Sequence, residues 1–252
     1  MSKGPLRVPH EGLTAGPAAL SEDAAAYVVR VHRLTPGAKL VLFDPELGLE
    51  ADAELVGADK RSARVHVFEP RPATRHARPI ALLQGVGKGD KMDAIVRDAT
   101  ELGAARVIPV LCERSIARPD AARSSRWRRI AVEAARQSGR GDAPKVSPPL
   151  SLAGALEAVT GSAGLCLDPT STDPLGLALQ RLSARSEDRA DGHTLPIALL
   201  VGPEGGLTDA ELTQAQEAGF DRVTLGPIVL RTETAGAAVL GALLVHAQLA
   251  LG

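Results

Sequence analysis

Two tracts near the carboxyl end of this chain share one pattern: an apolar run, a turn of glycine and proline, and a helix start. The first covers residues 199–208 and turns at Gly202-Pro203-Glu204-Gly205-Gly206. The second covers residues 225–235 and turns at Gly226 and Pro227. Almost wholly apolar strands are typical of a parallel sheet that is buried on both faces. Open α/β sheets bind ligands at the carboxyl ends of such strands, so the two tracts predict the active site.

The sequence around these tracts predicts the rest of the sheet. From residue 79 onward, apolar runs of strand length alternate with helical periodicity, which is the pattern of a parallel sheet with crossover helices. We predict strands at 79–84, 106–111, 163–168, 195–201 and 221–225, and helices at 90–102, 123–138, 151–159, 208–218 and 233–251. The polar stretch 183–194 is expected to form a surface loop.

The first 70 residues follow a different pattern, with short alternating strands and one helix. We predict strands at 39–44 and 63–68 and a helix at 21–34, with Ser21 as its N-cap. Three prolines between residues 70 and 79 mark a boundary. The chain is therefore expected to contain a small β domain over residues 1–72 and an α/β domain over residues 73–252.

Composition limits what the chain can bind. Aromatic residues make up only 2% of the sequence, so the core must be aliphatic and no stacking platform for bases is available. The net charge of -1 conceals two basic stretches, residues 60–78 and 113–145. Clustered positive charge suggests attraction to a polyanion. Helix faces that are merely solvated would give the same pattern, so this interpretation stays open.

Cysteine and histidine usage argues against a disulfide framework and against a metal site. Cys112 and Cys166 lie far apart without CxxC spacing, and no pair of histidines has ligand spacing. The first ten residues lack an apolar signal core, and no apolar run reaches membrane-spanning length. We therefore expect a soluble cytoplasmic protein that needs no metal and does not contact a membrane.

A glycine-rich segment, Gly85-Val86-Gly87-Lys88-Gly89-Asp90, follows the first strand of the α/β part. It suggests a dinucleotide loop, but its glycine spacing matches neither the dinucleotide fingerprint nor a phosphate loop. The preferred interpretation is a basic loop whose Lys88 and Lys91 touch a phosphate backbone or only solvent. A nucleotide-dependent oxidoreductase that uses this loop remains an alternative class.

Together, the two glycine–proline tracts closely resemble the paired signatures of the bacterial 16S ribosomal RNA uridine-N3 methyltransferases, which belong to the SPOUT superfamily of knotted methyltransferases. The likeness extends to residues 101–103, 113–115, 127–130 and 134–140, and to residues 29–34 in the N-terminal part. It thus covers nearly the whole chain. One position departs from the pattern, because residue 228 is Ile where the family usually carries Arg.

The resemblance implies a PUA-like N-terminal β-barrel and a C-terminal parallel-sheet domain of SPOUT type with a deep trefoil knot and a homodimer contact. It also implies S-adenosylmethionine as methyl donor. The acceptor would be N3 of one uridine, customarily uridine 1498, in 16S rRNA of the small ribosomal subunit. A methyltransferase of the same fold acting on another RNA site remains an alternative, as does an rRNA-binding assembly factor without catalysis.

The resemblance and the basic stretches assign roles to individual residues. The cofactor would be bound by Leu167, Leu200, Val201, Gly202, Pro203, Glu204, Gly205, Gly206, Leu225, Gly226, Pro227, Val229, Leu230 and Thr234. RNA would be contacted by Arg30, Arg33, Lys88, Lys91, Arg114, Arg136 and Arg140. The catalytic candidates are Arg231, Glu233 and Arg140.

Uracil N3 is a weak acid that stays mostly protonated at neutral pH, so its methylation needs a base or a positive group that stabilises the anion. Arg231 and Arg140 are candidates for charge stabilisation, and Arg140 could supply the positive charge that Ile228 does not carry. Glu233 is a candidate base, although a carboxylate beside an arginine at a helix start is more often structural. Alignment of N3 with the methyl group could also supply most of the rate without a base.

Overall fold

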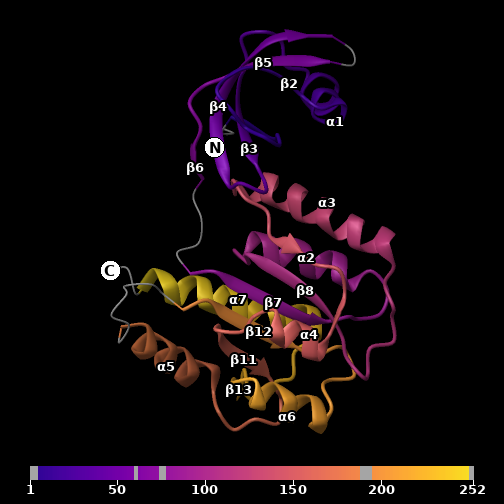
Figure 1. Ribbon diagram of the computed structural model, residues 1–252, viewed down its shortest axis with the longest axis vertical. Helices are drawn as coiled ribbons and strands as arrows, with labels where there is room; N and C mark the ends of the chain where they lie inside the picture. Colours follow the sequence, from indigo (N-terminus) through magenta and orange to yellow (C-terminus); the bar gives the residue numbers. More distant parts are fainter. Residues whose placement is uncertain (1–4, 60–61, 74–77, 188–194, 250–252) are drawn as a thin grey trace. The chain divides into compact units, whose positions relative to one another are not determined.

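The computed structural model describes residues 5–59, 62–73, 78–187 and 195–249 of the chain. Residues 1–75 and 132–143 form one compact unit, and residues 76–131 and 144–252 form the other. Figure 1 shows the sheet of each unit and the helices that pack on it. A domain boundary at residue 72 stays a prediction, since the first unit also takes in a segment from the middle of the chain.

Within the described residues, the first unit contains a six-stranded sheet in the order β1-β3-β4-β5-β2, with β6 paired to β4. Its strands are β1 (Leu6–Pro9), β2 (Gly16–Ala19), β3 (Lys39–Asp44), β4 (Leu49–Ala58), β5 (Ala63–Val67) and β6 (Arg71–Pro72). β1 lies parallel to β3, and the other pairs are antiparallel. Alternate side chains of β5 are buried, as the period of a strand with one core face requires.

The helix predicted at residues 21–34 begins where expected and ends early. Ser21 Oγ accepts a hydrogen bond from the Ala24 N–H over 3.3 Å, which confirms the N-cap. Helix α1 (Glu22–Ala26) then continues as a π-helical turn, η1 (Tyr27–Val31). Arg33 has a φ of 54°, a left-handed conformation that no helix can continue through. This backbone change ends the helix before Leu34.

The second unit is built on a parallel sheet in the order β10-β8-β7-β12-β11-β13, with β9 also paired to β8. Its strands are β7 (Ile80–Gly85), β8 (Arg106–Leu111), β9 (Lys145–Val146), β10 (Leu150–Ser151), β11 (Ala163–Leu167), β12 (Ile197–Val201) and β13 (Phe220–Val223). Each strand pair in this sheet is parallel. The five strands predicted from the sequence are confirmed, with ends that differ by two residues at most.

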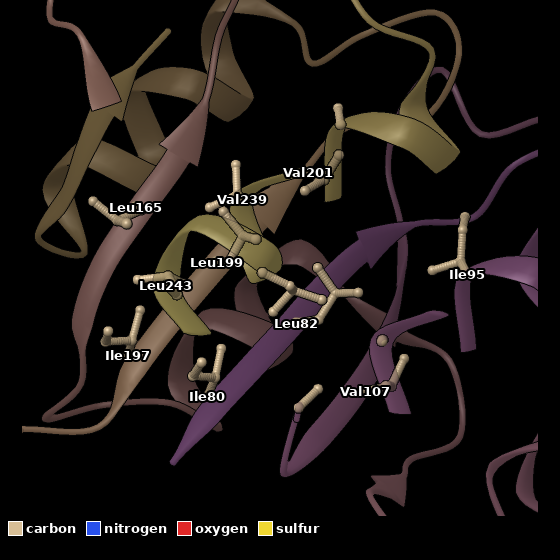
Figure 2. Packing of buried hydrophobic residues seen from close by; sticks show 14 of the residues in the cluster. Ile80, Leu82, Ile95, Val107, Leu165, Ile197, Leu199, Val201, Val239 and Leu243 are labelled. Carbon is tan, nitrogen blue, oxygen red and sulfur yellow. The ribbon is translucent and has the colours of Figure 1, made fainter. Parts of the chain in front are cut away.

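Helices cover both faces of this sheet. One face carries α2 (Lys91–Glu101), the first part of α3 (Ala121–Ser138), α5 (Leu175–Glu187) and α7 (Thr232–Leu249), and the other carries α4 (Leu152–Glu157) and α6 (Asp209–Glu217). Successive strand residues supply opposite cores, so Leu82 packs on the first face and Leu83 on the second. Figure 2 shows Val239 and Leu243 of α7 close to Leu199 on the first face.

The prediction of a surface loop at residues 183–194 is wrong for residues 183–187, because α5 continues to Glu187. Residues 188–194 lie outside the described residues. Leu175, Leu179 and Leu182 recur at helical spacing and are buried against the sheet, which stabilises a helix that the polar sequence did not suggest. Ser183 Oγ then lies 2.7 Å from His246 Nε2 of α7, so the polar end of α5 is also held by a neighbouring helix.

Candidate active site

The predicted site lies where two neighbouring strands send the chain to opposite faces of the sheet. β7 and β12 are paired in parallel. The chain enters α2 on one face after β7 and α6 on the other face after β12. Loops that diverge in this way leave a crevice at the carboxyl edge of a parallel sheet. The turn at residues 202–206, which we call the cofactor turn, leaves β12 at this edge.

The second tract reaches the same edge from another strand. β13 lies beyond β11 in the sheet, yet α7 packs against α2 and β12. Residues 224–231 therefore carry the chain back toward the middle strands. Thr232 Oγ1 donates a hydrogen bond to the Gly202 carbonyl over 2.6 Å, which joins the two tracts directly. The deep knot implied by the resemblance stays a prediction.

A buried polar bridge ties both tracts to β7. Gln84 is fully buried, and its Nε2 lies 2.9 Å from Thr232 Oγ1 and 3.4 Å from the Gly202 carbonyl. Because the single hydroxyl hydrogen of Thr232 goes to Gly202, the Thr232 oxygen must accept from Gln84, and this fixes the orientation of the amide. Sequence reasoning missed Gln84. The available signal was one amide in an otherwise apolar strand.

Main-chain packing and a capping box shape the cofactor turn. A Cβ added at Gly85 would lie 2.4 Å from the Pro203 nitrogen, so only glycine fits at the end of β7. Thr208 and Glu211, whose spacing in the sequence is that of a capping box, form one in the structure, and the Thr208 N–H donates to Glu211 over 2.9 Å. The other Glu211 oxygen accepts from the Glu113 N–H over 2.8 Å. The helix that follows the turn is thereby anchored to the segment after β8.

Arg114, predicted to contact RNA, lies on the cofactor turn. Its Nη1 donates to the carbonyl of Gly205 over 2.9 Å and lies 3.3 Å from the carbonyl of Leu207. A Cβ added at Gly205 would lie 3.1 Å from the Arg114 Cβ. The guanidinium therefore stabilises the turn backbone, and the glycine makes room for the arginine stem.

Lys91 connects the cofactor turn with the start of α7. Its Nζ lies 3.2 Å from Glu204 Oε1 and 3.3 Å from Glu233 Oε2. The backbone N–H of Glu233, together with Lys91, holds the pKa of the Glu233 carboxyl below its usual value despite partial burial. A carboxylate with a lowered pKa is a weaker base. This contact favours the structural interpretation of Glu233 over the role of general base.

Asp168 fixes the segment that follows β11, next to Leu167, one of the predicted cofactor residues. Burial alone would raise the pKa of its carboxyl, but the Thr170 N–H and the Arg222 guanidinium outweigh it and hold the pKa below the usual value. The carboxylate accepts from the Thr170 N–H over 2.9 Å and from Arg222 Nε over 2.8 Å. This ion pair ties the segment after Leu167 to β13. Arg222 was not among the predicted site residues.

The remaining cofactor candidates differ in exposure. Leu200 and Val201 are buried in opposite cores, so only their backbone groups can face a ligand. Leu167 and Leu230 pack partly on the first core. Ile228 and Val229, which directly precede Leu230, are open to solvent and are 73% and 72% exposed. Leu225, Gly226, Pro227 and Thr234 are exposed as well.

The remaining basic and catalytic candidates fall into three groups. Arg231 and Lys88 are exposed at the same edge of the sheet. Arg30 and Arg33 are exposed in the first unit. Arg136 and Arg140 belong to the first unit and are held internally. The Arg136 guanidinium lies 4.0 Å from the Tyr27 ring centroid and pairs with Glu133, and Arg140 Nε donates to Asp142 over 3.0 Å.

Two family models match the chain: an RNA methyltransferase domain over residues 74–244 and an RNA methyltransferase PUA domain over residues 20–68. The chain belongs to this RNA methyltransferase family. The family resemblance drawn from the two tracts is thereby confirmed, as is an α/β domain that follows a PUA-like domain.

Curated relatives cover most of the chain. It is 31% identical to the ribosomal RNA small subunit methyltransferase E of Bacillus subtilis over 239 residues, which are 92% of this chain and 91% of that protein. The protein of the same name from Mycobacterium tuberculosis is 32% identical over 238 residues, or 91% and 86% of the two chains. The Synechocystis relative is 37% identical over 160 residues, and the match spans 62% of this chain and only 50% of that protein.

Solved structures agree on the fold. A ribosomal RNA small subunit methyltransferase E from Neisseria gonorrhoeae, bound to S-adenosyl methionine, superposes with a TM-score of 0.83 at 32% identity and covers 96% of this chain and 98% of its own. A putative methyltransferase from Legionella pneumophila, in complex with the same cofactor, gives a TM-score of 0.83 at 27% identity with the same coverage. Both matches span the PUA-like unit and the α/β unit.

Two properties of the described residues bear on membranes and metals. Across the ranges that the structure covers, no helix is both long and apolar enough to cross a bilayer. Within the same ranges, no three His, Cys, Asp or Glu side chains are grouped so that they could hold a metal ion.

Removing the Thr232 hydroxyl should loosen the junction of the two tracts. In Thr232→Val, the Gly202 carbonyl and the Gln84 amide each lose their shortest hydrogen bond, which should lower the free energy of unfolding by about 1–3 kcal/mol. Thr232→Ser keeps the hydroxyl and serves as the control. Urea unfolding can be followed by the fluorescence of Trp127, the single tryptophan, which is buried in this unit. Equal stability of the Val and Ser variants would contradict the bridge.

The Asp168–Arg222 pair predicts a pH-dependent contribution to stability. Because the folded pKa of Asp168 lies below the usual 3.8, its ionised form stabilises the fold fully above that pH and progressively less as the pH falls through the folded pKa. Asp168→Asn should therefore be less stable than wild type at neutral pH, and the difference should shrink below pH 3.8. Denaturant unfolding at several pH values measures this. A difference that stays constant with pH would show that Asp168 contributes no charge interaction.

Proposed function

We propose that this chain transfers the methyl group of S-adenosylmethionine to N3 of a specific uridine in 16S rRNA of the small ribosomal subunit. The observation that carries the proposal is the Thr232–Gly202 contact, which joins the two glycine–proline tracts at the carboxyl edge of the sheet. Relatives named as ribosomal RNA small subunit methyltransferases and related structures that hold the cofactor support the same conclusion.

The residues at this edge suit a cofactor that has both apolar and hydrogen-bonding surface. The cofactor turn offers backbone N–H and C=O groups close to a ligand, because glycines at 202, 205 and 206 present no side chain. The exposed apolar side chains of Leu225 and Val229 can form one wall. When bound, S-adenosylmethionine supplies an electrophilic methyl group on a sulfonium. We assign Leu167, Leu230 and Thr234 to the remaining walls.

Charge stabilisation is assigned to Arg231. It is exposed and directly precedes α7, so its guanidinium and the positive end of the helix add their potentials at one place. Such a potential favours the uracil anion as the N3 proton leaves. Glu233 is held by Lys91 and is assigned a structural role. The second contribution to the rate is then the alignment of N3 with the methyl group. Arg140 remains the candidate for a second positive group when RNA is bound.

RNA binding is assigned to exposed basic residues in both units. Arg30 and Arg33 would contact RNA from the PUA-like unit, and Lys88 from the α/β unit. Arg114 and Arg136 make internal contacts, so their contribution to RNA binding would be indirect. The exposed Ile228 supports a homodimer formed through the α/β unit, because an exposed apolar side chain favours contact with a second copy. A protein with this substrate would act in the cytoplasm.

Two alternatives make different predictions. A methyltransferase for another RNA site would modify RNA at a different nucleotide, and an assembly factor would bind ribosomal RNA without modifying it. The oxidoreductase alternative has no remaining support, because Gly85 and Gly87 of the glycine-rich segment pack against the protein's own Pro203 and Glu204.

Methyl transfer to small ribosomal subunits that lack the modification tests the proposal. Purified protein, labelled S-adenosylmethionine and unmodified subunits should give N3-methyluridine at one position, which mass spectrometry of RNA fragments locates. Fully modified subunits are the control and should accept no methyl group. A product at another nucleotide would support the first alternative, and binding without product would support the assembly factor.

Arg231→Ala should lower kcat about 100-fold while the dissociation constant of the cofactor stays within about threefold of wild type, because the guanidinium acts on charge that develops during transfer. Arg231→Lys keeps the charge and should retain more of the rate. Single-turnover transfer and calorimetric titration with S-adenosylhomocysteine measure the two quantities. A variant that loses cofactor binding but transfers methyl normally at saturation would refute this role.

A further inference from the structure

Gly85, Gly87 and Lys91 have no part in the proposed function, yet they pack against the cofactor turn. A Cβ at Gly85 would lie 2.4 Å from the Pro203 nitrogen. A Cβ at Gly87 would lie 3.0 Å from both carboxylate oxygens of Glu204. The close approach of Pro203 therefore requires glycine at position 85, and Gly87 leaves room for the Glu204 carboxylate. These contacts give both glycines a role other than phosphate binding.

Two donors from this segment fix the carboxylate of Glu204. The backbone N–H of Lys88 donates to Oε1 over 2.9 Å, and Lys91 Nζ lies 3.2 Å from the same oxygen. Burial would raise the pKa of Glu204, but its own backbone N–H and these donors outweigh it and keep the pKa below the usual value. Glu204 therefore stays charged at neutral pH, and its contacts with Lys88 and Lys91 hold the cofactor turn.

Lys91 also reaches the second tract. Its Nζ lies 3.3 Å from Glu233 Oε2, and Glu233 is two residues from Arg231. One ammonium group thus joins the first turn of α2, the cofactor turn and the first turn of α7. Without it, two carboxylates of like charge would face each other across the junction of the two tracts.

We propose that Lys91 is a positioning residue for methyl transfer. It fixes the cofactor turn relative to residues 231–233 without touching the cofactor or the RNA base. This inference rests on the proposed function for its catalytic consequence. A displacement of about 1 Å between reacting groups can cost a large factor in rate, so a small relaxation of this junction matters. Exposed ion pairs add little to global stability, so the effect should be local.

Hydrogen exchange in the cofactor-free protein tests the local effect. In Lys91→Met, amides in peptides that cover residues 202–207 and 231–236 should exchange about tenfold faster than in wild type, while peptides from the sheet core stay unchanged. Lys91→Arg keeps the charge and should restore most of the protection. The matched control is Arg97→Met, which removes an exposed charge from the same helix, where Arg97 pairs only with its neighbour Asp98 among the contacts described. Unchanged exchange at both tracts in Lys91→Met would overturn the proposal.

Kinetics test the catalytic effect. Lys91→Met should lower kcat about tenfold with an unchanged KM for the ribosomal subunit. The loss in the double variant with Glu233→Gln should be smaller than the product of the single losses, because both changes break one contact. A raised KM with normal kcat would instead place Lys91 on the RNA and overturn the proposal, as would fully multiplicative losses. If wild type transfers no methyl group, the proposed function fails, while the exchange experiment still decides whether Lys91 holds the two tracts.

Discussion

The hydrogen bonds between Gln84, Thr232 and the Gly202 carbonyl are the contact on which the rest of the site depends. They join the end of β7, the cofactor turn after β12 and the start of α7, which are far apart in the sequence. A buried amide is stable in an apolar core only when its donors are satisfied, so this bridge requires one arrangement of the three segments. The bridge therefore limits how far the cofactor turn and the start of α7 can move relative to each other.

The parallel sheet makes this bridge possible. β7 and β12 are neighbours whose following helices lie on opposite faces, and the crevice between the diverging loops is a general consequence of that topology. The start of α7 lies directly against β7, where a Cβ at Gly236 would be in ordinary van der Waals contact with Gln84 Oε1 at 3.5 Å. The packing of α7 on the first core thus also places the start of α7 next to the cofactor turn. The ion pairs of Lys91 with Glu204 and Glu233 add to this junction, whose arrangement is already set by the buried contacts.

Basic residues show how far a charge pattern can be interpreted from sequence alone. The stretch 113–145 suggested a surface for a polyanion, but Arg114 binds carbonyls of the cofactor turn and Arg136 lies on the Tyr27 ring. Both side chains use their charge within the protein. Sequence cannot separate these cases, because an arginine that donates to a distant carbonyl and one that faces solvent have the same local pattern. The carboxyl-terminal part of α5 was missed for a related reason, because its stability comes from packing of Leu179 and Leu182 on the sheet.

The sequence by itself determined the parallel α/β pattern, most strand positions, the Thr208 capping box and the two tracts that identify the family. These features depend on local periodicity, turn chemistry and short motifs, all of which are visible along a single chain. Only the tertiary structure decided that Gln84 and Thr232 join the tracts, that Gly85 and Gly87 make room for residues 203 and 204, and that Lys91 holds two carboxylates. The physical reason is that each of these contacts joins residues distant in sequence, whose approach follows from strand order and helix packing and not from any local preference.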